Sequence, residues 1–322
     1  MLDIIVTHYD EPWEIVKPFF DMLDAQRLCD FSQVRVRIVH DGTKAFPKSY
    51  FSHMPVEVIQ NTIPHKGVSA ARNYGIDHSN AKWIMFCDCD DAFSSIYALK
   101  LILDVMHTED YDVLWNEFIM EVGEKHGITI HTKKGFNLVW IHNKYYRMSF
   151  LKENNFRFNE DLYMSEDSAF NAVIGLHIPP ERIGHIKSPM PLYIWAYRNG
   201  SVTLDPKNTL RNMIGHYERN LYVLDEFRKC DHPDADAMTA RVMTDAYVNL
   251  TRDELPDGCE VFEKRVRAFI RENAEILNRL PKERFDSVLK ASEREAFSGG
   301  FLGRNRPDVH TWLRTIFRCK SQ

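Results

Sequence analysis

The sequence lacks several features that mark whole classes of protein. No uninterrupted apolar run approaches the roughly 20 residues of a membrane-spanning helix, and the chain begins without a basic segment or a cleavage site. The six cysteines show no Cys-x-x-Cys spacing, which disfavours a zinc site and a small disulfide framework. Internal repeats and low-complexity tracts are also missing. We therefore expect a cytoplasmic protein with free thiols and without a transmembrane segment.

Length and charge give the first positive information. With 322 residues, 44% of them hydrophobic, the chain can form one large domain with an appendage, or two domains. Residues 259–322 contain 14 Lys and Arg and 9 Asp and Glu, which gives a net charge of +5. Because the net charge of the whole chain is −5, residues 1–258 have a net charge of −10. A basic tail indicates contact with lipid headgroups, an anionic glycan or nucleic acid. The alternative is a solvated helical face.

Short apolar runs alternate with amphipathic segments through the first two hundred residues. The runs predict strands over residues 3–7, 34–40, 56–60, 83–87, 113–117 and 189–197, and a hairpin over 118–134. The spacing of apolar residues predicts helices over 13–28, 65–76, 99–106 and 145–154. Strands that alternate with helices in this way are typical of an α/β protein with a mostly parallel, doubly wound sheet.

The composition changes after Pro206. Apolar residues at helical spacing predict helices over 210–227, 234–251, 259–279 and 282–296, separated by Pro233, Pro256 and Pro281. We therefore expect two parts, residues 1–205 and a helical appendage over 206–322.

An acidic cluster follows the strand expected at residues 83–87. Its carboxylates are Asp88, Asp90 and Asp91. Carboxylates at the end of a buried strand repel one another and lose hydration unless a cation compensates. Mg²⁺ or Mn²⁺ shared with a substrate phosphate would do so, at the edge where open sheets bind ligands. The alternative is an acidic turn in which Asp91 caps the next helix.

Seven segments together resemble a known family. They are DIIVTHYDEP (3–12), VRIVHDGTK (36–44), HKGVSAARNYGID (65–77), MFCDCDDAF (85–93), NKYYRMSF (143–150), MSEDSAF (164–170) and YIWAYRNGSVT (193–203). Their order and spacing resemble a family 2 glycosyltransferase of the GT-A fold over about residues 1–205. The resemblance implies an inverting transfer of a sugar from a nucleotide-diphosphate sugar to a hydroxyl group, and the expected donor is a UDP-sugar. The expected acceptor is a glycan or glycoconjugate, with a nucleic acid as the alternative.

The resemblance also implies a donor site. Its residues would be Thr7, Tyr9, Asp41, Lys66, Arg72, Asn73, Asp88 and Ser201. Tyr9 would stack on the nucleobase, and Asp41 would accept a hydrogen bond from a uracil or thymine imide. Arg72 would pair with Asp41 or lie along the base. His40 stands where the family usually has an acid, which leaves the base open. The alternatives are a turn at Asp41 and a surface arginine at Arg72.

Metal binding and catalysis are assigned by the same resemblance. Asp88 would face the ribose and a metal-bound water, Asp90 would ligate Mn²⁺ or Mg²⁺ directly, and Asp91 would contact the donor sugar. The side chain of Cys89, between the first two acids, should point away.

An inverting transfer needs one carboxylate to deprotonate the acceptor hydroxyl. By analogy Asp167 is that base, and Glu166 helps to orient the acceptor; the alternative is a pair of acids that satisfies a helix dipole. Arg198 would offset charge on the leaving diphosphate. Lys144 would share that part or brace the fold.

Two competing functions remain open on the residues. A sugar-nucleotide pyrophosphorylase would need a Gly-rich phosphate loop after the first strand, where this chain has His8-Tyr9-Asp10. A nucleotide- or glycan-binding module without catalysis would not need Asp88, Asp90, Asp167 and Arg198 together. We expect the appendage at 206–322 to position the acceptor or to mediate association, including homo-oligomers and peripheral contact with a membrane.

Overall fold

The computed structural model describes residues 1–107, 110–125, 128–196, 209–298, 302–304 and 306–318. The chain divides into two units, Met1–Asn199 and Gly200–Gln322, and each has its own hydrophobic core. The boundary predicted at residues 205 and 206 falls within 197–208, outside the described residues.

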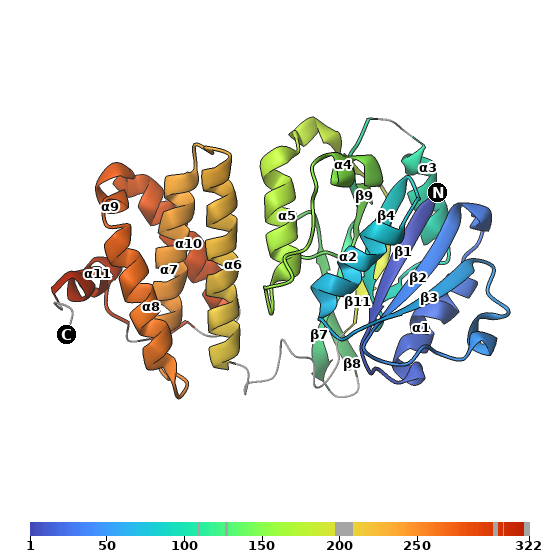
Figure 1. Cartoon of the computed structure of the whole chain (residues 1–322), viewed down its shortest axis with the longest axis horizontal. Helices are drawn as coiled ribbons and strands as arrows, with labels where there is room; N and C mark the ends of the chain where they lie inside the picture. The colour runs from blue at the N-terminus through green and yellow to red at the C-terminus, as the bar shows by residue number, and fades with distance from the viewer. Residues whose placement is uncertain (108–109, 126–127, 197–208, 299–301, 305, 319–322) are drawn as a thin grey trace. The chain divides into compact units, whose positions relative to one another are not determined.

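A seven-stranded sheet of order β10-β6-β9-β4-β1-β2-β3 organises the first unit (Figure 1). Its strands are β1 (Leu2–His8), β2 (Val34–Asp41), β3 (Glu57–Ile63), β4 (Trp83–Asp88), β6 (Val113–Trp115), β9 (Lys144–Arg147) and β10 (Ile183–His185). Strand β1 pairs in parallel with β2 and β4, and only β9 among these strands runs antiparallel to its neighbours. The mostly parallel sheet predicted from the sequence is confirmed.

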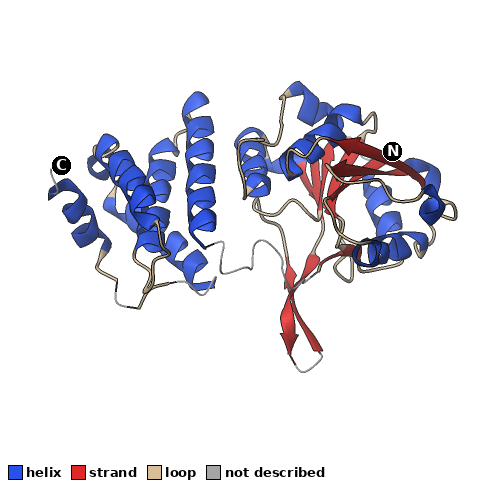
Figure 2. Cartoon of the chain, turned by 60° about the horizontal axis from the view of Figure 1, so that its bottom comes forward, coloured by secondary structure: helices blue, strands red, loops and turns tan. Residues whose placement is uncertain are grey.

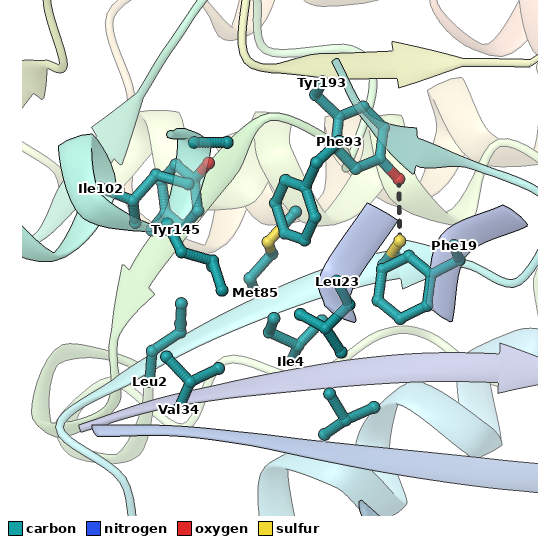
Figure 3. Close-up of a cluster of buried hydrophobic side chains, with 14 of the residues drawn as sticks. Leu2, Ile4, Phe19, Leu23, Val34, Met85, Phe93, Ile102, Tyr145 and Tyr193 are labelled. Carbon is teal, nitrogen blue, oxygen red and sulfur yellow. Dashed lines mark hydrogen bonds between the residues drawn. The ribbon is translucent and has the colours of Figure 1, made fainter. Parts of the chain in front are cut away.

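Helices cover both faces of this sheet. They are α1 (Trp13–Asp24), α2 (Val68–His78), α3 (Ala98–Met106), α4 (Met148–Glu153) and α5 (Glu166–His177), with short 3₁₀ turns η1 (Phe31–Gln33), η2 (Lys48–Phe51) and η3 (Pro180–Arg182). Successive side chains of a strand point to opposite faces. Leu2 and Ile4 of β1 therefore share one core with α1 and α3 (Figure 3). Ile5 faces α2, where Gly75 allows close approach: a Cβ there would lie 2.5 Å from Ile5 Cγ2.

A second, four-stranded sheet has the order β5-β11-β7-β8. Its strands are β5 (Ala92–Phe93), β7 (Phe118–Lys125), β8 (Ile128–Lys134) and β11 (Tyr193–Trp195). Strands β7 and β8 form the predicted hairpin, which projects from the rest of its unit (Figure 2). The strand predicted over 189–197 is shorter, because β11 covers three residues where it pairs with β5 and β7.

The helix predicted over residues 145–154 is wrong in its first part. Lys144–Arg147 is strand β9, inserted between β4 and β6, and helix α4 begins only at Met148. All four residues of β9 are buried. A strand that is covered on both faces has no alternation of polar and apolar residues, so its pattern gave no strand signal.

The second unit is helical. Its helices are α6 (Thr209–Lys229), α7 (Ala235–Leu250), α8 (Cys259–Glu272), α9 (Ile276–Arg279), α10 (Lys282–Ser298) and α11 (Val309–Arg318). The helix predicted over 259–279 is divided into α8 and α9, and α11 was not predicted. Trp312 and Ile316 of α11 are buried in the unit's core. Among the described helices, none combines the length and apolar character needed to cross a membrane.

Candidate functional site

The carboxyl ends of β1, β2 and β4 meet at one edge of the large sheet. Thr7 lies opposite Asp88 in the register of β1 and β4, and Asp41 ends β2 on the other side of β1. Because ligands of open parallel sheets bind at this edge, the structure brings three of the predicted donor-site residues to a suitable place.

Arg72 of α2 connects two acidic groups that are far apart in the sequence. Its Nη2 donates to Asp88 Oδ1 at 2.9 Å, and its Nη1 donates to Glu166 Oε1 at 2.6 Å. The guanidinium lies 5.3 Å from the centre of the Phe158 ring, and the side chain is almost fully buried. One arginine therefore fixes Asp88 relative to the acidic pair at the start of α5.

The charges around Arg72 explain why it can be buried. Burial disfavours the guanidinium cation, but the carboxylates of Asp88, Glu166 and Asp167 outweigh this effect and raise the pKa of Arg72. The predicted pairing of Arg72 with Asp41 is wrong, because Arg72 forms its ion pairs with Asp88 and Glu166.

Asp41 instead holds the loop that leads into α2. Its carboxylate accepts hydrogen bonds from the backbone N–H of Lys66 (2.7 Å) and of Gly67 (2.9 Å), and His65 Nδ1 lies 2.9 Å from Oδ2. Asp41 is buried. Gly67 has φ of +92°, a conformation that favours glycine. Asp41 therefore shapes the wall of the site, with its two oxygens already engaged.

Tyr9 lies at the mouth of this edge. It is 54% exposed and stacks on His65, with 4.5 Å between the ring centres and 23° between the planes. The side chain of Lys66 is exposed beside it. The sequence did not single out His65, although its place just before the Gly67 turn was the available signal. A second exposed ring is thus present at this edge in addition to Tyr9.

Asn73 has a structural position. Its Nδ2 donates to the Phe158 carbonyl and to Glu160 Oε1, both at 2.9 Å, and its Oδ1 accepts from the Phe158 N–H. Because its side-chain amide is committed to residues 158–160, Asn73 supports the wall behind Arg72.

The carboxylates that follow β4 differ in how far they are buried. The side chain of Asp88 is 34% exposed, whereas Asp91 is buried and bonded to Tyr193 Oη at 2.6 Å and to the Ala196 N–H at 3.0 Å. Burial, with Asp88 and Asp90 close by, raises the pKa of Asp91 well above its ordinary value. Asp91 thus anchors β11, which argues against the predicted contact with a donor sugar. Cys89 packs into the core, as predicted.

Asp88 and Asp90 are the candidate metal ligands. In the described part of the chain, no three His, Cys, Asp or Glu side chains are close enough to form a metal cage. Magnesium sites that share a substrate phosphate use only one or two protein carboxylates. Two partly exposed carboxylates at the ligand-binding edge fit a hard divalent cation of that kind.

Asp167 lies in the first turn of α5, one residue after Glu166. It is half-buried, and its Oδ1 accepts a hydrogen bond from the Ser168 N–H at 2.7 Å. Burial, followed by the charge of Glu166, raises the pKa of Asp167 to about 7, although Arg72 acts in the opposite direction. A carboxyl group with a pKa near neutrality is suited to accept a proton from a hydroxyl group.

Lys144 is fully buried beneath the same helix. Its Nζ donates to the Trp140 carbonyl at 2.6 Å, and Asn171 of α5 donates to the same oxygen at 2.9 Å. Asn171 is one helical turn after Asp167 and accepts from Tyr146 Oη. Burial lowers the pKa of Lys144 to about 7, and Asp167 counteracts this shift. Lys144 braces the loop before β9 against α5, the second of its two predicted roles.

Two predicted residues, Arg198 and Ser201, lie outside the described residues.

The profile of glycosyl transferase family 2 matches residues 3–170, more than half of the chain. No curated protein is close enough in sequence to count as a match.

Among solved structures, residues 1–349 of S. aureus TarS in complex with UDP superpose with a TM-score of 0.61 at 16% identity, covering 96% of this chain and 94% of that one. The complex of the same protein with UDP-GlcNAc gives 0.52 at 15% identity, with 95% and 98% covered. The mannosyltransferase PcManGT from Pyrobaculum calidifontis, in complex with GDP-Man and Mn²⁺, gives 0.50 at 11% identity, with 98% and 84% covered. These likenesses show a shared GT-A fold.

Proposed function

Because the chain belongs to glycosyl transferase family 2, we propose that it transfers a sugar from a nucleoside-diphosphate sugar to an acceptor hydroxyl with inversion. The proposed donor is a UDP-sugar, and the proposed acceptor is a glycan or glycoconjugate. Asp167 acts as the general base in a single displacement.

The observation that carries this proposal is the double ion pair of Arg72. It joins Asp88, on the donor side, to Glu166, next to the proposed base. A single displacement requires the leaving group and the base on opposite sides of one carbon atom. A buried guanidinium that fixes both acids supports such a preset arrangement.

The chain's own residues suit the two halves of the reaction. Asp167 is ionised above a pH of about 7 and can then take the proton of the attacking hydroxyl. Tyr9 and His65 offer stacked rings to a base at the mouth of the edge. Asp88 and Asp90 would hold the divalent cation, which when bound offsets the charge of the diphosphate.

The donor and metal also find support in the solved relatives. The TarS structures contain UDP and UDP-GlcNAc, and PcManGT contains GDP-Man and Mn²⁺. We favour UDP for this chain because the TarS complex with UDP is the more similar of these, and Mn²⁺ or Mg²⁺ as the cation. The helical unit would position the acceptor or mediate association.

The test is the slow release of free nucleoside diphosphate from UDP-sugars and GDP-mannose, with Mn²⁺, Mg²⁺ or EDTA. We expect UDP from at least one UDP-sugar, and only with metal. A sugar-nucleotide pyrophosphorylase would instead form UTP when pyrophosphate is added. A binding module would bind the donor and release nothing, which would contradict the proposal.

The base is tested by two substitutions of similar shape. Asp167→Asn should lower turnover by about 10²–10⁴-fold, the usual contribution of a general base, while donor affinity stays close to that of the unchanged protein. An active Asp167→Asn protein together with an inactive Glu166→Gln protein would move the base one residue upstream.

A further inference from the structure

The helical unit contains a cavity that the proposed reaction does not use. Its volume is about 530 Å³, within the range of small-molecule sites. It lies where α7 ends, between that end, the segment that precedes α11, and α11 itself. The lining residues are Leu250, Thr251, Arg252, Asp253, Arg304, Arg306, Pro307 and Trp312. All of them belong to the second unit, so the cavity does not depend on how the two units are arranged.

The lining is cationic. Three arginines face one carboxylate, Asp253, whose Oδ1 already accepts the Arg304 N–H at 2.9 Å. Glu293 of α10, which pairs with Arg306 Nη2 at 2.5 Å, is the second acid in contact with these arginines. The lining itself carries three positive groups and one negative group. Glu293 and Asp308 both act on Tyr247 together with Arg306, so they offset this positive charge from outside the lining.

Arg306 carries an unused donor. Its Nη1 is buried and makes no hydrogen bond to any described residue, whereas its Nη2 is engaged by Glu293. The guanidinium is held over the Tyr247 ring, with 5.6 Å from Cζ to the ring centre. Buried donors in folded proteins almost always have a partner, and an ion or a water is the usual one when the protein offers none.

Part of the remaining wall is apolar. Trp312, which is 7% exposed, Leu250 and Pro307 provide it. Tyr247 Oη donates to the Pro307 carbonyl, and a Cβ on Gly303 would lie only 2.2 Å from the Thr251 carbonyl oxygen, so the segment before α11 is packed tightly against the end of α7. A ligand that fits must therefore join an anionic group to a compact organic part.

We propose that the helical unit binds an organic phosphate in this cavity, with the phosphate at Arg304 and Arg306 and the organic part against Trp312. Arginine matches phosphate oxygens with pairs of parallel hydrogen bonds, which favours phosphate over a single carboxylate. The phosphate belongs to a sugar phosphate or to a lipid headgroup, two sources with the same recognition chemistry. The inference goes beyond the proposed transfer reaction and does not require it.

The experiment uses the full chain with excess UDP and Mn²⁺, so that a donor site is filled. Calorimetry then measures the binding of glucose 1-phosphate, with glucose as the neutral control. Flotation with phosphatidylglycerol or phosphatidylcholine vesicles tests the lipid source. The variants are Arg304→Gln, which changes an exposed side chain, and Arg306→Gln. The matched control is Arg284→Gln, an exposed arginine of the same unit paired with Asp234.

We expect glucose 1-phosphate or phosphatidylglycerol to bind, and each cavity variant to weaken that binding about tenfold, as the loss of a charge-assisted hydrogen bond implies. The control variant Arg284→Gln should bind as tightly as the unchanged protein. Glucose and phosphatidylcholine vesicles should not bind. If Arg306→Gln fails to fold, Arg304→Gln decides alone. Absence of binding by both phosphate ligands, or binding that Arg304→Gln leaves unchanged, would overturn the proposal.

Discussion

Replacing Asp167 by asparagine should make the protein more stable as well as less active. The carboxyl group is placed where its ionised form is disfavoured, with a pKa of about 7 caused first by burial and then by Glu166. Asparagine has nearly the same shape, and its side-chain oxygen can still accept the Ser168 N–H that Asp167 Oδ1 accepts. The substitution therefore removes the charge and keeps the local hydrogen bond.

The size of the effect follows from linkage. In an unfolded chain an aspartate titrates near 3.9, so between about pH 4 and 7 the folded state keeps a proton that the unfolded state loses. The stability of the unchanged protein consequently falls as pH rises through this window and stays low above it. At about 1.36 kcal/mol per pH unit, Asp167→Asn should gain about 1–2 kcal/mol at pH 5 and up to about 4 kcal/mol at pH 8.

The assay is urea unfolding followed by tryptophan fluorescence between pH 5 and 8.5. Five of the six tryptophans, at 13, 83, 115, 140 and 195, belong to the first unit, so the signal reports mainly on the unit that contains Asp167. Asp161→Asn, an exposed acid of the same unit, is the control and should show no such gain. A stability difference that does not grow with pH would refute the reasoning about the environment of Asp167.

Three further predictions concern the rest of the site. Asp90→Asn should keep the fold but lose metal-dependent donor binding; unchanged UDP affinity with Mn²⁺ in calorimetry would remove Asp90 as the main ligand. Arg72→Met should lower the free energy of unfolding by about 3–5 kcal/mol, since it leaves the largely buried carboxylate of Glu166 without its partner. It should also move the acid limb of the pH–rate profile to higher pH, because Arg72 lowers the pKa of Asp167; an unmoved limb would count against that coupling. A chain ended at Pro206 should still hydrolyse donor but no longer glycosylate acceptor, and full transfer by it would exclude a role of the helical unit in acceptor positioning.

The strands and the edge of the sheet could be predicted because local pattern determines them. Residues 3–7 and 83–87 are continuous apolar runs, and each ends at polar residues, which marks a buried strand and its carboxyl end. The same reasoning failed at Lys144–Arg147, because a lysine and an arginine are buried there in a strand. The hydrogen bond of Lys144 to Trp140, and the ion pair of Arg147 with Asp112 together with its contact with Trp83, make that burial tolerable.

The pairings between side chains within the site could not be predicted in the same way. Arg72 pairs with Glu166 across 94 positions of sequence, and Asp91 bonds to Tyr193 across 102. Such pairs depend on how strands and helices pack, which no local pattern contains. Sequence resemblance named Asp41 and Asp91 as contacts of the donor and Arg72 as a partner of Asp41 or of the base, whereas the structure gives each of them other partners within the protein.

The measurement that tests the central claim most directly is the configuration of the sugar first released from an α-linked donor. Time-resolved proton NMR of slow donor hydrolysis, recorded before mutarotation, observes the anomeric proton of that product. A single displacement, assisted by Asp167 as the base, predicts that the β-sugar appears first. An α-sugar as the first product would show retention and would contradict the proposed mechanism.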